Sequence, residues 1–402
     1  MTKTFRVQKL GALLLGMLFP VTAFAIEQSY QGENLSHASF TAKDLTGTKF
    51  LNCRLDFAGF ENASGSNISF QGSSGDYTRF NSSGFVSANF KAAVLRNSNF
   101  TMSELHGVNF QNATLDAANF SHAILWKASF TSASLIKALF TETKFTDKTD
   151  FSKANLDSAL FSNSSLEDAD FTQTNFHNTR FRDVKFDHAD FRGAVFDHTN
   201  LASCGFSDAD LRNTAGRTAD FTAGNFVEAD LRGFKCVQCR FNQAEFSYAH
   251  LDNADFRQGE FKEASFHKTD VEDVDFSGSV FTAADFSESS ISNCDFSGAD
   301  LSGILWNPKK LHKNRYDDQT RFPPGYVPNA KQMQRVSTRP LEPMELVEQP
   351  QQVRQVQQPA PPNKPVQQVK QEAPRPSAPV PANAKRSSPL PPEEDRPIGP
   401  AQ

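Results

Sequence analysis

The sequence predicts an all-β solenoid, in which the chain winds round a narrow core as a parallel β-helix. The main observation is a large apolar residue at every fifth position, here called the centre or position i, as in Phe191 and Phe196. A small residue, usually Ala, Ser or Thr, precedes it at i−2, and the other three positions are polar, Gly or variable. This spacing fits neither the 3.6 period of a helix nor the 2.0 period of a strand, so it is an internal repeat.

The repeat runs from Leu35 to Phe145 and, after one inserted residue near 146–150, resumes at Phe151 and continues to Leu301. It has 54 centres, of which 33 are Phe and 15 are Leu. The centres that lack a large side chain are Gly65, Gly75, Gly216 and Cys236. Because Gly removes a core side chain, we expect a void and a locally distorted coil at the first two.

The pentads 209–213 and 229–233 read Ala-Asp-Leu-Arg-Asn and Ala-Asp-Leu-Arg-Gly. This pattern resembles the pentapeptide-repeat family, whose consensus is A-(D/N)-L-X-X. The resemblance covers residues 33–303 and departs from the consensus in preferring Phe to Leu at the centre. It implies a right-handed quadrilateral β-helix with four pentads in each coil and one pentad on each face.

In such a coil the residues at i and i−2 point inward, and i−1, i+1 and i+2 point outward. Residues 20 apart then stack at the inter-strand spacing of about 4.8 Å, which gives about 13 coils for the whole repeat. Stacked aromatic side chains bury large areas. One predicted column is Phe40, Phe60, Phe80, Phe100, Phe120 and Phe140, and the opposite one is Phe50, Phe70, Phe90, Phe110 and Phe130.

Residues 1–25 have the pattern of a secretory signal peptide. Three basic residues lie among the first nine, Leu10 to Phe19 form a short apolar run, and Ala23-Phe24-Ala25 has the A-x-A cleavage pattern. The run is too short to cross a bilayer as a helix, and no other stretch is long enough, so no membrane span is expected. We therefore expect an exported protein, periplasmic or extracellular, whose mature chain begins at Ile26.

The repeat region, 26–303, is followed by two further predicted parts. Thr320 to Tyr326 resembles the terminal segment that often follows such repeats, and 304–328 is interpreted as a C-terminal cap. Residues 329–402 are rich in Pro and Gln and contain no Phe, Tyr or Trp, so a disordered tail is predicted. Of 21 Pro residues, 20 lie from Pro308 onward and none lies in the repeat, as a paired β-backbone requires.

Charge is divided between the same parts. Residues 26–306 contain 23 basic and 37 acidic residues, a balance of −14. Residues 307–402 contain 15 basic and 9 acidic residues, a balance of +6. An acidic rod repels polyanions, so nucleic acid is not expected as a partner.

Cys236-Val237-Gln238-Cys239 is a C-x-x-C segment, which alone suggests zinc binding or redox chemistry. In the repeat, Cys236 is a centre and Cys239 an i−2 residue, so both point into the core as small apolar side chains. No second C-x-x-C completes four zinc ligands. A disulfide after export stays an alternative, but the pattern favours core packing. Cys53, Cys204 and Cys294 are also i−2 residues.

Eight of the nine His residues lie in the repeat, all at outward positions. His188 has Asp168 and Asp208 one coil away on either side, and His177 has Asp197 one coil above it. On a convex face without a cleft, these side chains are interpreted as solvated columns. The sequence therefore predicts no catalytic, cofactor-binding or metal-binding residue, and no cofactor.

Of two further outward features, only the first is a contact candidate. Trp126 stands at i+1, where an exposed Trp favours protein contact. The other is a column of Arg at i+1 beside a column of Asp at i−1, which is interpreted as a solvated face. Its members are Arg192, Arg212, Arg232, Asp190, Asp210 and Asp230.

Three functions compete. The first is a non-catalytic exported scaffold that binds a protein or another envelope component through the rod and attaches through the tail, and a homo-oligomer is compatible with it. The second follows from the resemblance: some members of the family mimic DNA and bind type II topoisomerases, which requires a cytoplasmic location. The third is an enzyme, and no motif in the sequence provides a cleft. We expect the first.

Overall fold

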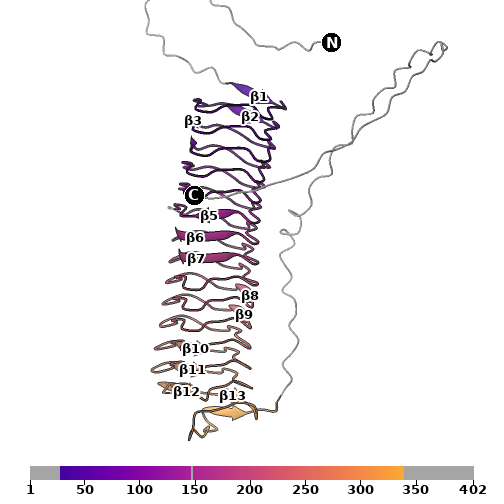
Figure 1. Ribbon diagram of the computed structural model, residues 1–402. Helices are drawn as coiled ribbons and strands as arrows, with labels where there is room; N and C mark the ends of the chain where they lie inside the picture. The colour runs from indigo at the N-terminus through magenta and orange to yellow at the C-terminus, as the bar shows by residue number, and fades with distance from the viewer. Residues whose placement is uncertain (1–27, 146–147, 306, 339–402) are drawn as a thin grey trace, which may run out of the picture. The chain divides into compact units, whose positions relative to one another are not determined.

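The computed structural model describes residues 28–145, 148–305 and 307–338. These residues contain no α-helix and form a parallel β-solenoid of about 15 turns (Figure 1). The predicted all-β class is therefore confirmed. The expected signal peptide and most of the expected tail lie outside the described residues. No helix long and apolar enough to cross a membrane occurs in the part of the chain that the structure describes.

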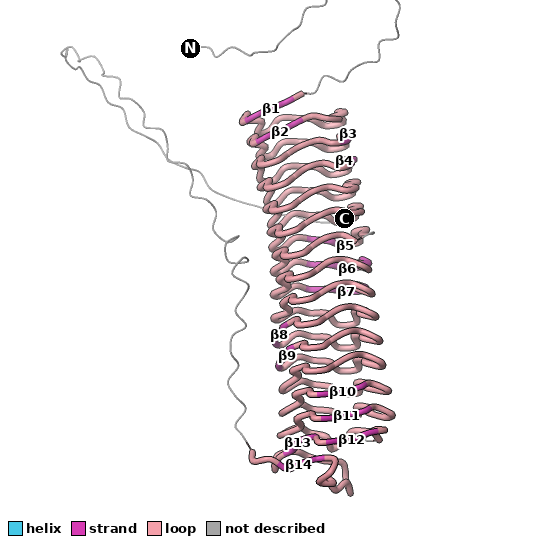
Figure 2. Tube along the Cα trace, turned by 180° about the vertical axis from the view of Figure 1, so that it is seen from behind, coloured by secondary structure: helices cyan, strands magenta, loops and turns pink. Residues whose placement is uncertain are grey.

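The strands are short segments separated by turns (Figure 2), and every pair of the described strands is parallel. Their pairs and triplets are β1–β2, β3–β4, β5–β6–β7, β8–β9, β10–β11–β12 and β13–β14. Their bounds are β1 Ser29–Gln31, β2 Lys49–Leu51, β3 Ser64–Ser66, β4 Gly84–Val86, β5 Leu139–Thr141, β6 Leu160–Ser165, β7 Arg180–Lys185, β8 Ala215–Arg217, β9 Lys235–Val237, β10 Asp270–Glu272, β11 Ser290–Ser292, β12 Lys310–His312, β13 Asn314–Tyr316 and β14 Met333–Arg335.

The pairing register gives the coil length directly. Asn34 pairs with Arg54, and the same separation of 20 residues recurs along the solenoid. Across the expected insertion the separation becomes 21, because Ser129 pairs with Asp150. The inserted residue is therefore absorbed within one coil, and the core columns continue beyond it.

Most corners of the coil are β-turns formed by positions i+1 and i+2. At the first corner the Ala38 N–H donates a hydrogen bond to the Leu35 carbonyl oxygen at 3.0 Å, and His37 has a φ of 61°. Among the described residues, 47 that are not glycine have positive φ, nearly all of them at i+2. A positive φ at this place is what a type II turn requires, and it favours Gly and Asn over bulky residues.

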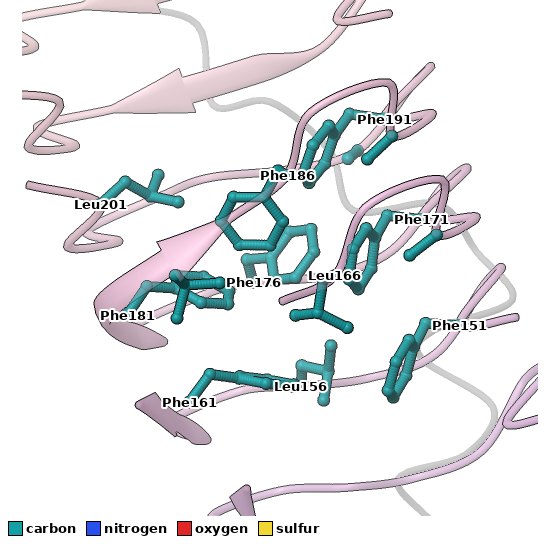
Figure 3. Packing of buried hydrophobic residues seen from close by; sticks show 14 of the residues in the cluster. Phe151, Leu156, Phe161, Leu166, Phe171, Phe176, Phe181, Phe186, Phe191 and Leu201 are labelled. Carbon is teal, nitrogen blue, oxygen red and sulfur yellow. The ribbon is translucent and has the colours of Figure 1, made fainter. Parts of the chain in front are cut away.

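The core contains the residues at i and i−2, as predicted. Phe191 and Ala189 are fully buried, and the Phe rings stack from coil to coil (Figure 3). Phe100, for example, lies between Phe80 and Phe120, with ring centroids 4.7 and 4.8 Å away. The two predicted Phe columns meet edge to face across the core, which is a favourable arrangement for aromatic rings.

The expected voids at Gly65 and Gly75 are not formed, because other residues of the solenoid, mainly in the preceding coil, lie close to both glycines. A Cβ atom on Gly75 would lie 2.5 Å from Thr78 Oγ1 and 2.7 Å from Leu55 Cβ. A Cβ atom on Gly65, which has a φ of 151°, would lie 2.6 Å from the Thr46 backbone nitrogen. The pairing register of 20 is also kept at β3 and β4, so the coil is not displaced.

The solenoid extends further than the sequence suggested. Strand β12 pairs with β11, which places Leu311 one coil after Ile291 within the expected cap. Strand β14 pairs with β13, and Met333 is buried although it lies beyond residue 329, where we expected the disordered tail to begin. Repeat spacing did not reveal this closing segment, because a second extra residue separates Asp300 from its partner Arg321.

The N-terminal end is built differently. The Tyr30 ring stacks on Phe50 at 5.1 Å and meets Phe40 edge to face at 5.9 Å. Tyr30, Leu35 and Phe40 pack against the core but are only partly buried. No described residue precedes Gln28, so the described part of the chain places nothing over the first coil.

Candidate functional site

The outward positions form columns along the solenoid, because residues one coil apart occupy the same place on successive turns. These columns are the surfaces available for function, since the inward positions fill the core. The two halves of the repeat, 28–145 and 148–305, carry different columns. The first half contains 9 basic and 8 acidic residues, and the second contains 14 basic and 27 acidic residues. The negative charge of the rod therefore lies in its second half.

The predicted Asp and Arg columns form one continuous ladder of ion pairs. Arg212 Nη2 lies 2.6 Å from Asp210 Oδ2 in its own coil, and Arg212 Nε lies 3.4 Å from Asp230 Oδ2 in the next coil. Arg192 makes the equivalent contacts at 2.5 Å with Asp190 and 3.6 Å with Asp210. The alternation of charge along the ladder offsets the repulsion within each column.

The ladder changes the ionisation of its carboxylates. Partial burial acts to raise the pKa of Asp230, but the hydrogen bonds from Arg232 and the nearby guanidinium charges outweigh it and lower that pKa. The Asp210 side chain raises the pKa of Arg212 further above its ordinary value. The Arg side chains of this surface are 38–53% exposed, so the pairs are hydrated. The interpretation as a solvated charged face agrees with this geometry.

A second acidic column is neutralised less evenly. Asp255, Asp275 and Asp295 pair along one face, and burial together with the charges of its two neighbours raises the pKa of Asp275. Arg257 Nε lies 3.9 Å from the Asp275 carboxylate, whereas Asp255 and Asp295 have closer Arg partners at 2.8 and 3.1 Å. Asp275 is therefore the least neutralised carboxylate of these three.

The predicted His–Asp neighbours are only partly brought together. His188 Nδ1 lies 3.9 Å from Asp208 Oδ2, and both side chains are exposed. His177 instead meets His198 edge to face at 5.4 Å. No group of three His, Cys, Asp or Glu side chains within the described ranges is placed to hold a metal ion.

Asp197 was expected to face water, and this was wrong. Its side chain is buried, with a residue exposure of 9%, and its Oδ2 atom lies 3.3 Å from Arg217 Nη2. The Oδ1 atom and the Arg217 Nε atom are both buried without a hydrogen-bond partner. The neighbouring Val195 and Val237 are also buried although they occupy outward positions, so this corner is recessed.

Cys236 and Cys239 form a disulfide, which corrects the expectation of unbonded core cysteines. Both residues are fully buried, so the predicted inward positions are correct. Only the expectation that the two thiols stay unbonded is wrong. Phe234 occupies the i−2 place before Cys236 and is fully buried, so the large and small residues of this pentad have exchanged positions. Gly216, one coil earlier, leaves room for the sulfur, because a Cβ there would lie 3.4 Å from Cys236 Sγ.

The other three cysteines are free and buried. Burial raises the pKa of the Cys204 thiol to about 12 and that of Cys294 to about 12. A thiol that stays protonated is a poor nucleophile and a poor metal ligand. These side chains are therefore part of the core, as their i−2 position predicted.

Trp126 lies on the surface as expected, with an exposure of 40% and its ring 4.8 Å from that of His106. It borders an open pocket of about 410 Å³ that also includes Glu142, Lys144 and Asn163. Open, shallow pockets on a convex surface exclude little water, so this one suits a contact with a macromolecule better than chemistry on a small substrate.

A surface column of aromatic rings was missed in the sequence. His37, Phe57 and Tyr77 stack along one corner, with ring centroids 5.1 and 5.4 Å apart. Phe57 is 44% exposed and Tyr77 is 52% exposed. The sequence does contain the pattern that predicts this column. Phe57 is not at a centre, and aromatic residues lie 20 positions before and after it, at His37 and Tyr77. Exposed Phe and Tyr at positive φ are doubly unfavourable in isolation.

Three family models match the sequence. One, described as a pentapeptide repeat region, matches residues 43–120. A second, pentapeptide repeats (9 copies), matches 140–185. A third, pentapeptide repeats (8 copies), matches 109–147, 179–214, 225–262, 239–278 and 264–303. Together these matches cover more than half of the chain. No curated protein sequence matches it.

Solved structures with a similar fold are distant in sequence. Trypsin-treated QnrB1, a plasmid-mediated fluoroquinolone resistance protein, is 18% identical over 46% of this chain and 90% of its own, with a TM-score of 0.30. HetL, from the cyanobacterium Nostoc sp. strain PCC 7120, is 18% identical over 66% of this chain and 92% of its own, with a TM-score of 0.17. Rfr23, from the cyanobacterium Cyanothece 51142, is 20% identical over 31% and 85%, with a TM-score of 0.15.

Proposed function

Because the chain belongs to the pentapeptide-repeat family, we propose that it is an exported, non-catalytic scaffold that binds a protein partner through the surface of its first half. Proteins of this family generally act in structure and interaction rather than catalysis. The outward columns supply contact surfaces, and the fully packed core supplies rigidity, so partners meet a surface that changes little on binding.

The observation that carries the proposal is the aromatic column His37, Phe57 and Tyr77. Of the 47 non-glycine residues with positive φ in the part of the chain that the structure describes, three are Phe or Tyr, and two of these three are neighbours in this column. The first half is also nearly neutral, and it carries further exposed apolar side chains at Val86, Met102 and Trp126. His37, Phe57 and Tyr77 share one column, whereas Val86, Met102 and Trp126 lie on other columns of the first half. Exposed aromatic residues that stack along one corner are typical of protein contact surfaces.

The test of partner binding uses the chain from Ile26 onward as bait, either unchanged or with Phe57→Asn and Tyr77→Asn. Asn tolerates positive φ, so these changes remove the rings without strain. A partner held through the column should lose at least tenfold in affinity. The matched control is Asp168→Asn with Asp208→Asn, at the same turn position in the acidic half. Equal affinity for all three baits would reject this surface.

Export is the second component of the proposal, and it rests on the leader pattern of residues 1–25. The expected result is that protein recovered from fractionated cells begins at Ile26 and is absent from the cytoplasm. Sequencing of the N-terminus decides this, because a protein that still begins with Met1 would show that the leader is not removed.

We also propose that the chain beyond the described solenoid attaches the protein to an envelope component. The segment 351–392 contains 6 basic residues and 1 acidic residue among many Pro and Gln residues, which suits weak contact with acidic surfaces. Deletion from residue 339 onward should lower retention in the envelope fraction and leave the melting temperature unchanged. Deletion from 329 should also lower the melting temperature, because it removes Met333 and β14. Unchanged retention would mean that this segment is only a spacer.

DNA mimicry is the second candidate, and the acidic half favours it. Asp150, Asp170, Asp190, Asp210 and Asp230 form a column of carboxylates along one face, and the last three of them are paired with the Arg side chains of the ladder. A mimic should compete with duplex DNA for a type II topoisomerase, and replacement of these residues by Asn should abolish the competition. A mature protein found only outside the cytoplasm would exclude this role.

A further inference from the structure

The two ends of the solenoid differ in how far their core residues are covered. At the C-terminal end Met333 is buried, β14 covers β13, and the Tyr326 ring stacks on Phe322 at 5.3 Å. At the N-terminal end the first coil, residues 28–47, leaves Tyr30, Leu35 and Phe40 only partly buried. Among the residues from Gln28 onward that the structure describes, the N-terminal end therefore presents the open cross-section of the Phe and Leu core.

The first coil also has unused backbone groups. In every later coil the residue at i−1 bonds to the coil before it, as the Arg54 N–H does to the Glu33 carbonyl oxygen at 2.9 Å. The residues at this position in the first coil are Asn34, Ser39 and Asp44. Their N–H and C=O groups make no backbone hydrogen bond within the described residues. These groups form the edge of three faces at once, and such edges readily pair with another chain.

The last coil carries residues that hinder edge-to-edge pairing with another chain, and the first coil carries fewer of them. Natural proteins block an edge with Lys, Pro or a covering segment. The last coil has Lys309, Lys310 and Lys313, with Pro308, Pro323 and Pro324 beside it. The first coil has no Pro, and its charged residues are Glu33, Lys43 and Asp44, a balance of −1. Two such ends can meet with little repulsion.

The length of chain before the first coil decides what can cover it. Ser29 is the first residue of β1, and only three residues, 26–28, separate it from the expected cleavage after Ala25. Three residues cannot cover an end made of four faces. Once the leader is removed, the open end must be covered by something other than this chain's own N-terminus.

We propose that the first coil is the interface of a two-fold symmetric dimer formed by the chain that begins at Ile26. A two-fold axis perpendicular to the solenoid axis brings the two first coils together with their strands antiparallel. The unused N–H and C=O groups of each copy then bond to the other, and Tyr30, Leu35 and Phe40 of both copies become buried. His37, the outermost ring of the aromatic column, then lies next to the joint. The inference rests on the proposed export, because it needs the leader to be removed.

The test measures the mass of the purified chain 26–402 by size-exclusion chromatography with light scattering. The expected result is twice the monomer mass, falling to the monomer mass on dilution. The variant Ser29→Lys with Gln31→Lys places extra positive charges at the joint on exposed positions of β1, and its dissociation constant should rise at least tenfold. The matched control is Ser69→Lys with Gln71→Lys, the same residue types two coils further along the same face, and it should dimerise as the unchanged chain does.

A second measurement locates the interface. Amide hydrogen exchange at Asn34, Ser39 and Asp44 should be slower in the dimer than in the Ser29→Lys, Gln31→Lys variant, whose unchanged melting temperature would show that it folds. A monomer at about 100 µM would overturn the proposal, and so would a dimer that both Lys variants weaken equally. A dimer of purified 26–402 together with Met1 retained in cells would keep the interface and reject export.

Discussion

The halves 28–145 and 148–305 share one core and differ at the surface. In both, Phe rings stack from coil to coil, as between Phe80 and Phe100 at 4.7 Å and between Phe171 and Phe191 at 5.0 Å. Outside, the first half is nearly neutral and exposes aromatic rings, whereas the second half has an excess of 13 acidic residues and an Asp–Arg ladder. A repeat that fixes two positions in five leaves the other three free to specialise.

This separation has a physical cause. The inward positions must fill a cross-section of constant size, so their residues are restricted to one large and one small side chain in each pentad. The outward positions interact mainly with water and with the same position one coil away. The surface can therefore change along the solenoid while the core stays the same.

The largest expected effect tests whether the core is equivalent in both halves. Phe100→Ala and Phe191→Ala should each lower the free energy of unfolding by about 3–5 kcal/mol, because each removes a fully buried ring and leaves a cavity. Chemical denaturation measures both values, with Lys262→Ala, an exposed side chain, as the control. A cost that differs by more than a factor of two would show that the halves do not share one core.

The next effect should appear in the acidic half alone. Asp197→Ala leaves the Arg217 guanidinium without its carboxylate at a recessed corner, and should cost about 1–3 kcal/mol. Asp76, at the equivalent corner position in the first half, is partly exposed, and Asp76→Ala should cost less than about 0.5 kcal/mol. Equal thermal shifts for the two would mean that the buried contact contributes nothing.

A smaller effect depends on pH and has opposite signs at two aspartates. The folded pKa of Asp230 is lowered, so its contribution is present above the ordinary value of 3.8 and is lost as the pH falls through the folded pKa. The folded pKa of Asp275 is raised, so its charge destabilises the fold above that pKa and this penalty disappears as the pH falls towards 3.8.

Two substitutions test the opposite contributions of Asp230 and Asp275 to stability. At pH 7, Asp230→Asn should lower the melting temperature and Asp275→Asn should raise it. Below the folded pKa of Asp230 both variants should melt close to the unchanged protein, because the carboxyl groups are then neutral. A loss of stability in Asp275→Asn at pH 7 would mean that the stronger hydrogen bond that the charged carboxylate accepts from the Ser277 N–H outweighs the burial and the charge of its neighbours.

Much of the fold could be predicted because the five-residue period reports directly which side chains face the core. The period also located the inserted residue near 146–150 and the buried positions of Cys53, Cys204 and Cys294. It failed where a residue's environment depends on the neighbouring coil rather than on its own pentad. Gly75 has no void because Leu55 lies against it, and Asp197 is buried because Arg217 covers it.

The candidate surfaces were harder to predict for the same reason. The disulfide depends on Gly216 one coil earlier and on the exchange of sizes between Phe234 and Cys236, neither of which follows from the C-x-x-C spacing. A single charge balance for the whole rod concealed that only the second half is acidic. The closing segment at Met333 could not be found by spacing, because it follows an extra residue and has no repeat.

The smallest expected effect concerns the stability of the first half's surface. Phe57→Asn and Tyr77→Asn should each change the free energy of unfolding by less than about 1 kcal/mol. Each removes ring stacking worth about 0.5–1.5 kcal/mol and relieves a positive φ that costs a bulky residue about 1–2 kcal/mol. Thermal melting beside Phe100→Ala measures the contrast between an outer and an inner ring. If the outer rings proved as costly to remove as Phe100, their role would be to hold the coils together. Changes in the free energy of unfolding close to zero would show that the outer rings do not stabilise the fold, which supports a role in binding.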